Sequence, residues 1–113
     1  MKIEIPIPKK VSTNKIYAGT HWTKRKELAD LFHQYLLPEK NKHKIKEFPV
    51  EITYIFRFKG KLLDCSNCTF MAKMLEDALV GIGLLPDDNP DYVSSIQIYS
   101  TDGYEDMVEI HIS

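Results

Sequence analysis

The sequence has few cysteines and no long apolar run. Its 113 residues include only Cys65 and Cys68, too few for a disulfide framework in a chain of this size. The longest apolar run, from Ala78 to Pro86, is far shorter than the roughly 20 residues that a membrane-spanning helix needs. The first residues, MKIEIPIPKK, lack the continuous apolar stretch and the cleavage pattern of an export signal. We therefore expect a cytoplasmic protein with reduced thiols and no membrane partner.

The formal net charge is only −1, which at first argues against a protein that binds nucleic acid. The charges are strongly segregated, however. Residues 1–61 hold fourteen lysines and arginines against six acids, a net charge of +8, whereas residues 62–113 hold one lysine against ten acids, a net charge of −9. Such a split is typical of a basic surface for a polyanion beside an acidic region that holds cations, although chance segregation on a solvated surface would also produce it.

Hydrophobic periodicity predicts six elements in the order β-α-β-α-β-β. Residues 2–7 alternate apolar and polar side chains, and residues 50–58 do so more strongly, as half-buried strands do. Apolar residues at helical spacing predict one helix from about Trp22 to Leu37 and a second over residues 71–82. Residues 92–100 and 106–112 are predicted as two final strands. We therefore expect a single α+β domain over residues 1–113, with one mixed sheet and two helices packed on it.

Two polar features accompany these elements. The segment EKNKHKIKE, residues 39–47, connects the first helix to the second strand and has no apolar face, so its simplest interpretation is a solvated loop. The second helix is predicted to carry Lys73, Glu76 and Asp77 on the face opposite its apolar residues.

The stretch from Asp64 to Cys68 places an acid, a hydroxyl, an amide and two thiols in five consecutive positions. A structural zinc site would need two more nitrogen or sulfur ligands, and none of the four histidines is paired at ligand spacing. A redox pair is a weaker interpretation, because thioredoxin-like motifs have a different βαβ setting. The simplest interpretation is that the cysteines pack a loop-to-helix junction, with Ser66 or Asn67 as helix cap and Asp64 near the positive helix end.

A second acidic pair, Asp87-Asp88, follows the second helix and allows another interpretation. If its loop returns toward the start of that helix, Asp64 and Asp88 converge. Two carboxylates about 4 Å apart repel by roughly 4 kcal/mol at an effective dielectric of 20, so such a pair needs a cation. Oxygen ligands completed by water favour magnesium, with manganese as the other candidate.

Lys73 is the only basic residue after position 61. Beside a metal-bound phosphate its ammonium could stabilise charge in the transition state or help to protonate the leaving oxygen. Its alternative role is an i,i+4 ion pair with Asp77, worth only a few tenths of a kcal/mol.

These residues together resemble the RusA family of Holliday junction resolvases, which is common in prophages. The resemblance is carried by Asp64-x-Ser66-Asn67, by Lys73 with Asp77-Ala78-Leu79, and by GLLPDDNPDYV with Asp87-Asp88. The segment PIPKKVSTNKIYAGTHWTKRKELAD also resembles the family's first strand, loop and helix. The likeness therefore spans nearly the whole chain.

The resemblance implies a homodimeric, magnesium-dependent endodeoxyribonuclease that resolves four-way DNA junctions in recombination and repair, without a small-molecule cofactor. It implies that Asp64 and Asp88 bind the metal and that Lys73 is the catalytic lysine. The further candidates at or near the metal are Ser66, Asn67, Asp77 and Asp87.

The sequence departs from the family pattern at two points. Ser66 stands where that pattern has a second acid, which leaves a non-catalytic junction-binding protein on the same scaffold as the alternative function. The segment between Asn67 and Lys73 is about three residues longer than in the pattern, close to one helical turn. Lys73 is therefore expected on the same helix face but displaced along the axis.

Basic residues interleaved with aromatic and polar ones in the first 26 positions suit DNA phosphates and stacked bases. The candidate DNA contacts are Lys9, Lys10, Asn14, Lys15, Tyr17, His21, Trp22, Lys24, Arg25 and Lys26. Taken singly, each of these lysines has a solvated surface charge as its simplest interpretation. Symmetric cleavage of two strands requires two active sites, so a two-fold homodimer is the economical architecture for a branched-DNA substrate.

Overall fold

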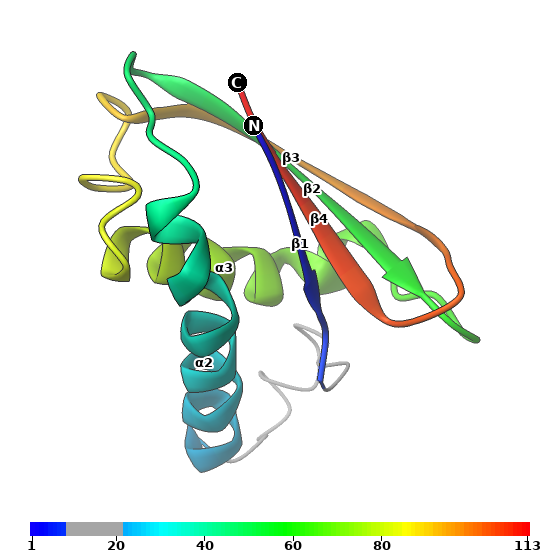
Figure 1. The fold of residues 1–113 in the computed structure, drawn as a ribbon. Coiled ribbons are helices and arrows are strands. Elements are labelled where there is room, and N and C mark those ends of the chain that lie inside the picture. Colours follow the sequence, from blue (N-terminus) through cyan, green and yellow to red (C-terminus); the bar gives the residue numbers. More distant parts are fainter. Residues whose placement is uncertain (9–21) are drawn as a thin grey trace.

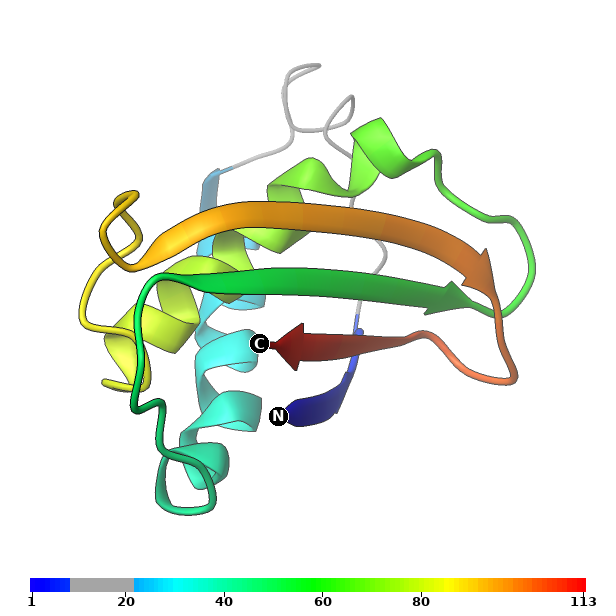
Figure 2. The ribbon, with the colours of Figure 1, turned by 90° about the horizontal axis from the view of Figure 1, so that it is seen from above.

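A four-stranded mixed sheet carries both helices on one of its faces in this computed structural model (Figures 1 and 2). The structure describes residues 1–8 and 22–113, and the side chains of the first helix from residue 25 onward. The principal elements are β1 (Lys2–Pro6), α2 (Trp22–Leu36), β2 (Val50–Phe58), α3 (Thr69–Gly81), β3 (Val93–Asp102) and β4 (Met107–Ile112). Two short 3₁₀ helices, η1 (Leu37–Asn41) and η2 (Cys65–Cys68), follow α2 and precede α3. The predicted α+β class and element order are confirmed.

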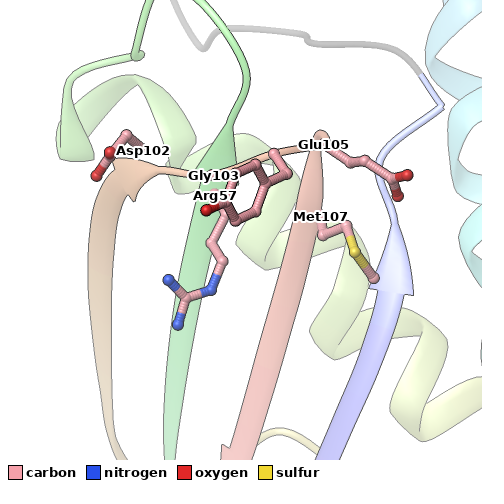
Figure 3. Close-up of a pocket in the computed structure, with 6 residues that line it drawn as sticks. Arg57, Asp102, Gly103, Glu105 and Met107 are labelled. Atoms are coloured by element: carbon pink, nitrogen blue, oxygen red, sulfur yellow. The ribbon is translucent and has the colours of Figure 1, made fainter.

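The strands are ordered β1-β4-β2-β3, with β2 parallel to β3 and β4 antiparallel to both β1 and β2. The consecutive strands β3 and β4 are therefore not neighbours, and their connection crosses the end of β2. There the backbone N–H of Gly103 donates a hydrogen bond to the carbonyl of Phe58 at 3.0 Å. A Cβ on residue 103 would lie 2.9 Å from the Cβ of Arg57, so glycine permits this close crossing (Figure 3).

The core lies between the sheet and the two helices. Alternate residues of β2 face it, and all five that the sequence predicted are buried: Val50, Ile52, Tyr54, Phe56 and Phe58. From α3 the six predicted apolar residues are buried as well: Met71, Met74, Leu75, Ala78, Leu79 and Ile82. The helices approach each other closely where His33 of α2 lies over Gly81, whose Cβ position would be 3.2 Å from the His33 ring. Within the described residues no helix is both long and apolar enough to cross a membrane.

The end of α3 directs the chain back toward the sheet. Gly83 adopts a left-handed φ of +86°, and its N–H donates to the carbonyl of Val80 while the N–H of Leu84 donates to that of Leu79. These bonds satisfy the last helical carbonyls, as a glycine-terminated helix end does. The following loop, residues 84–92, then leads to the first residue of β3 and carries Asp87 and Asp88.

Candidate functional site

The ammonium group of Lys73 lies among three carboxylates. Its Nζ is 2.6 Å from Oδ2 of Asp88, 3.1 Å from Oδ1 of Asp77 and 3.8 Å from Oε1 of Glu76. Glu76 and Asp77 are one turn further along α3, whereas Asp88 comes from the loop that follows the helix. Three predicted site residues, Lys73, Asp77 and Asp88, are therefore together in the structure.

Asp87 shapes the loop that presents Asp88. Its Oδ1 accepts a hydrogen bond from the backbone N–H of Asp88 at 2.7 Å, and its Oδ2 accepts one from the side-chain amide of Asn89 at 3.1 Å. The Oδ1 of Asn89 in turn accepts the backbone N–H of Asp91 at 2.9 Å. Asp87 therefore orients Asp88 within the loop. Asn89 was not among the predicted site residues, although Asp and Asn in such a turn typically bond to nearby backbone in this way.

The electrostatics of the cluster follow from these contacts. The hydrogen bond and charge of Lys73 lower the pKa of Asp88 below its ordinary value of 3.8. The hydrogen bond to Asp88, and then the one to Asp77, raise the pKa of Lys73 well above its ordinary value. At neutral pH this lysine is fully charged, so its ammonium is a fixed positive centre rather than a ready proton donor.

Glu76 corrects one prediction, because it is buried rather than on the solvated face of α3, with only 9% of its surface exposed. Burial raises its pKa, an effect that the charge of Lys73 partly offsets. The hydroxyl of Tyr54 is also buried and has no hydrogen-bond partner within the described residues. Burial, with Glu76 adding a smaller effect, raises the pKa of Tyr54. Helical periodicity identified the polar position of Glu76 but not the side chains that cover it.

A cleft between α2 and α3 opens beside this cluster. It has a volume of about 330 Å³, and α2 contributes Arg25 and Lys26 to its lining while α3 contributes Lys73, Met74 and Asp77. A smaller hollow of about 220 Å³ shares Met74 and Asp77 with it. Two predicted DNA contacts, Arg25 and Lys26, therefore lie on the same cleft as the predicted catalytic lysine.

Asp64 lies away from the cluster, at the start of η2, with an exposed carboxylate that makes no capping hydrogen bond. η2 inserts a further turn between Asp64 and α3, and Asp77 lies eight residues, or about 12 Å, further along the helix than Thr69. Within the described residues no hydrogen bond or ion pair links Asp64 to Lys73 or Asp88. The same holds for Ser66, which is exposed, and Asn67.

The contacts with β3 also distinguish the positions of Asp64 and Asp88. The Ser100 hydroxyl, near the end of β3, donates to the carbonyl of Leu63, just before Asp64. Asp88, by contrast, precedes Val93, the first residue of β3. Among the His, Cys, Asp and Glu side chains that the structure describes, no group of three or more is placed to hold a metal. Asp64 thus follows a residue that is bonded to the last part of β3, whereas Asp88 lies in the loop that leads to the start of this strand.

The two cysteines differ in their surroundings. Cys68 is completely buried, and burial raises the pKa of its thiol to about 11, so it stays protonated at neutral pH. Cys65 is exposed. Cys68 therefore packs the loop-to-helix junction, as its simplest interpretation predicted.

The remaining predicted DNA contacts are at the edge of the described structure. Lys9, Lys10, Asn14, Lys15, Tyr17 and His21 lie outside the described residues. Trp22 and Lys24 belong to α2, but their side chains lie outside the described part.

A further pocket opens where the β3–β4 connection crosses β2, on the sheet face opposite the helices (Figure 3). It has a volume of about 520 Å³ and is lined by Arg57, Asp102, Gly103, Tyr104, Glu105 and Met107. Arg57 donates its Nε–H to Oε1 of Glu109 at 3.0 Å, which satisfies part of its charge. None of the predicted site residues lines this pocket.

No protein-family model matches this sequence, and neither does any curated protein. The function of the chain is therefore inferred from its own residues and their geometry.

Proposed function

We propose that the protein is a magnesium-dependent endodeoxyribonuclease that cleaves branched DNA such as the four-way Holliday junction, in recombination and repair. The observation that carries the proposal is the ammonium of Lys73 between Asp88 and Asp77, at 2.6 and 3.1 Å, beside a cleft that Arg25 and Lys26 also line. A DNA backbone in this cleft would meet cations for its phosphates and carboxylates for a divalent ion.

Asp77 and Asp88 are the residues that fit a metal ion. Because both contact the same nitrogen, their nearest oxygens are separated by no more than the sum of 2.6 and 3.1 Å. Both donors are hard oxygen atoms, and magnesium commonly takes one or two carboxylates, filling its remaining positions with water and substrate phosphate. Magnesium, or manganese in its place, would supply activation of a water molecule and neutralisation of the scissile phosphate.

The other side chains take roles that follow from their charges. Lys73 stabilises negative charge on the phosphate, since its raised pKa makes proton donation to a leaving oxygen unfavourable. Asp87 keeps Asp88 in position through the backbone N–H of that residue. Arg25 and Lys26 hold the DNA backbone along the cleft. Asp64, beyond η2, is left outside this metal pair.

We also propose that two copies associate through β3, which supplies the two active sites that symmetric cleavage needs. Among the described strands β3 has a single neighbour, β2. Its residues 93–101 contain no charge and no proline, and Ile96 and Tyr99 are 49% and 52% exposed. Edge strands without such protective residues are templates for pairing with another chain.

Sedimentation measurements test this association. The wild-type protein is expected at twice its monomer mass of 13.1 kDa, and Ile96→Lys is expected to give the monomer. Ile96→Val, which keeps the edge apolar, is the matched control. A wild-type monomer at every concentration would contradict the proposed association.

A labelled four-way junction incubated with the protein and magnesium or manganese tests the nuclease. We expect paired nicks near the branch point and a loss of at least about 100-fold in rate for Asp88→Asn, because that change removes one charged ligand. Asp91→Asn, an exposed carboxylate of the same loop, is the control and is expected to retain the wild-type rate. If the wild-type protein cleaves no branched DNA with any divalent metal, the proposed activity is wrong.

A non-catalytic protein that binds DNA junctions is the second candidate. It is favoured by Ser66, a neutral hydroxyl where the resembled pattern has an acid, and by the distance of Asp64 from Asp88 along the fold. This function predicts retarded junctions in gels without nicks, and the same affinity for Asp88→Asn as for the wild type.

A further inference from the structure

The polar connector after α2 forms one wall of the most voluminous of the pockets described here, about 580 Å³. The opposite wall is the segment that follows α3, beside which the connector lies in both views (Figures 1 and 2). The exposed residues that line the pocket include Lys40, Lys42 and Lys44, and the more buried ones include Ile45, Phe48 and Leu84. A segment that the sequence presented as a solvated loop is therefore part of a concave site.

The lysines of this pocket are only partly neutralised. No acid lines the pocket, although Glu39, Glu47 and Asp87 each adjoin a lining residue in sequence. Glu39 already contacts Lys42 at 3.6 Å and His43 at 3.0 Å. In the described part of the chain neither Lys40 nor Lys44 has a carboxylate partner. Two lysines without a counter-charge beside a pocket attract anionic groups, and phosphates above all.

Phe48 gives the pocket an aromatic surface. The ring is half-buried and is held edge-to-face against Tyr92, with ring centroids 5.3 Å apart and an interplanar angle of 84°. Nucleic-acid bases stack on aromatic side chains with little dependence on sequence, and lysines near such a ring hold the phosphates. The volume is also in the range of small-ligand sites, roughly 300–1,000 Å³.

We infer that this pocket binds an unpaired nucleotide of a nucleic-acid strand, with its phosphates against Lys40 and Lys44 and its base against Phe48. Pro86 lines the pocket and precedes Asp88 by two residues, so a strand held here continues toward the Lys73 site. That continuity rests on the proposed nuclease function, in which the unpaired nucleotide belongs to the branch point of the DNA. The pocket's own binding does not depend on cleavage.

Anisotropy of a labelled oligothymidine, measured with EDTA over a series of salt concentrations, tests the inference without any cleavage. The double variant Lys40→Gln/Lys44→Gln is expected to weaken binding at least about 10-fold and to reduce the slope of log K against log [salt] by about 1.4, or about 0.7 per phosphate contact. Phe48→Leu, which keeps an apolar side chain, is expected to weaken binding about 5-fold or more with the slope unchanged.

The matched control is Lys2→Gln/Lys59→Gln, which removes two exposed lysines outside the pocket and is expected to leave affinity within about 2-fold. Equal losses for the two double variants, or no oligothymidine binding by the wild type, would overturn the inference. Preferential binding of poly-glutamate, lost in the pocket variant, would also overturn it and assign the pocket to an acidic protein. Failure of the nuclease proposal is recognised separately, as pocket-dependent binding without nicking.

Discussion

The loop before α3 and the loop after it carry similar polar side chains and use them differently. The first places Asp64, Ser66 and Asn67 close together in sequence, yet none of them is joined to Lys73 in the described structure. The second brings Asp88 to 2.6 Å from Lys73 and fixes it through Asp87. Polar residues that cluster along the chain form a charged site only where the fold returns them to the same helix face.

The difference has a structural cause. β2, α3 and β3 form a crossover with parallel strands, and the loop of residues 84–92, which joins the end of the helix to β3, folds against the helix before the strand begins. That path carries Asp88 along the polar face of α3. The segment before the helix instead forms the additional turn η2, and this turn separates Asp64 from Lys73 along the axis of α3.

The largest expected effect separates the two loops by activity. Asp88→Asn is expected to lower junction cleavage at least about 100-fold, because the charge beside Lys73 is lost, whereas Asp64→Asn is expected to lower it less than about 10-fold. Initial rates at saturating magnesium measure both. Equal losses would show that the loop of Asp64 closes onto the same ion when DNA binds.

A second, smaller effect concerns the pH dependence of the ion pair that Asp88, in the second loop, forms with Lys73 of α3. Because folding lowers the pKa of Asp88 below 3.8, its stabilising effect is present above that value and is lost as the pH falls through the folded pKa. Because folding raises the pKa of Lys73 above 10.5, its effect is present below that value and is lost as the pH rises through the folded pKa. The ion pair therefore stabilises the fold between about pH 4 and pH 10.

Lys73→Met is accordingly expected to raise the pKa of Asp88, which NMR titration of its carboxyl carbon measures. It is also expected to reduce the loss of folding stability at acid pH. Lys59→Met, an exposed lysine outside the site, is the control and is expected to leave both unchanged. An unaltered Asp88 titration in Lys73→Met would contradict the pairing.

The smallest expected effect comes from restoring an acid to the first loop. Ser66→Asp is expected to change the cleavage rate and the magnesium dependence by less than about 2-fold, because Ser66 is exposed beside η2 and away from Asp88. Metal titrations of the cleavage rate measure it, with Ser66→Asn as the neutral control. A clear gain in magnesium affinity would show that both loops serve one metal site.

Much of the fold could be predicted from periodicity, since the buried faces of β2 and α3 are legible in the sequence. The sheet order could not, because periodicity says which face of a strand is buried and not which strand lies beside it. The insertion of β4 between β1 and β2 depends on the crossing at Gly103, whereas Asp102-Gly103 in the sequence is typical of a tight turn between neighbouring strands.

The site was predictable to a lesser degree. Lys73 stood out as the only basic residue after position 61, Asp88 as part of an acidic pair, and Asp77 by its i,i+4 spacing to Lys73; the three do meet. The burial of Glu76 depends on the packing around it, and the pocket of Lys40 and Lys44 depends on the segment after α3, so neither follows from local pattern. The sequence did contain one sign that Asp64 is set apart from Lys73: the segment between Asn67 and Lys73 is about three residues longer than in the resembled pattern.

The central claim is that Asp77 and Asp88 bind the metal beside Lys73. A magnesium titration monitored by NMR of the aspartate carboxyl carbons tests it most directly, because each acid gives its own signal. We predict that the signals of Asp77 and Asp88 shift with one common midpoint, together with the Lys73 ammonium, while Asp64 stays unmoved. Asp64 shifting with the same midpoint as Asp88, or no shift at either Asp77 or Asp88, would contradict the assignment of the metal to this cluster.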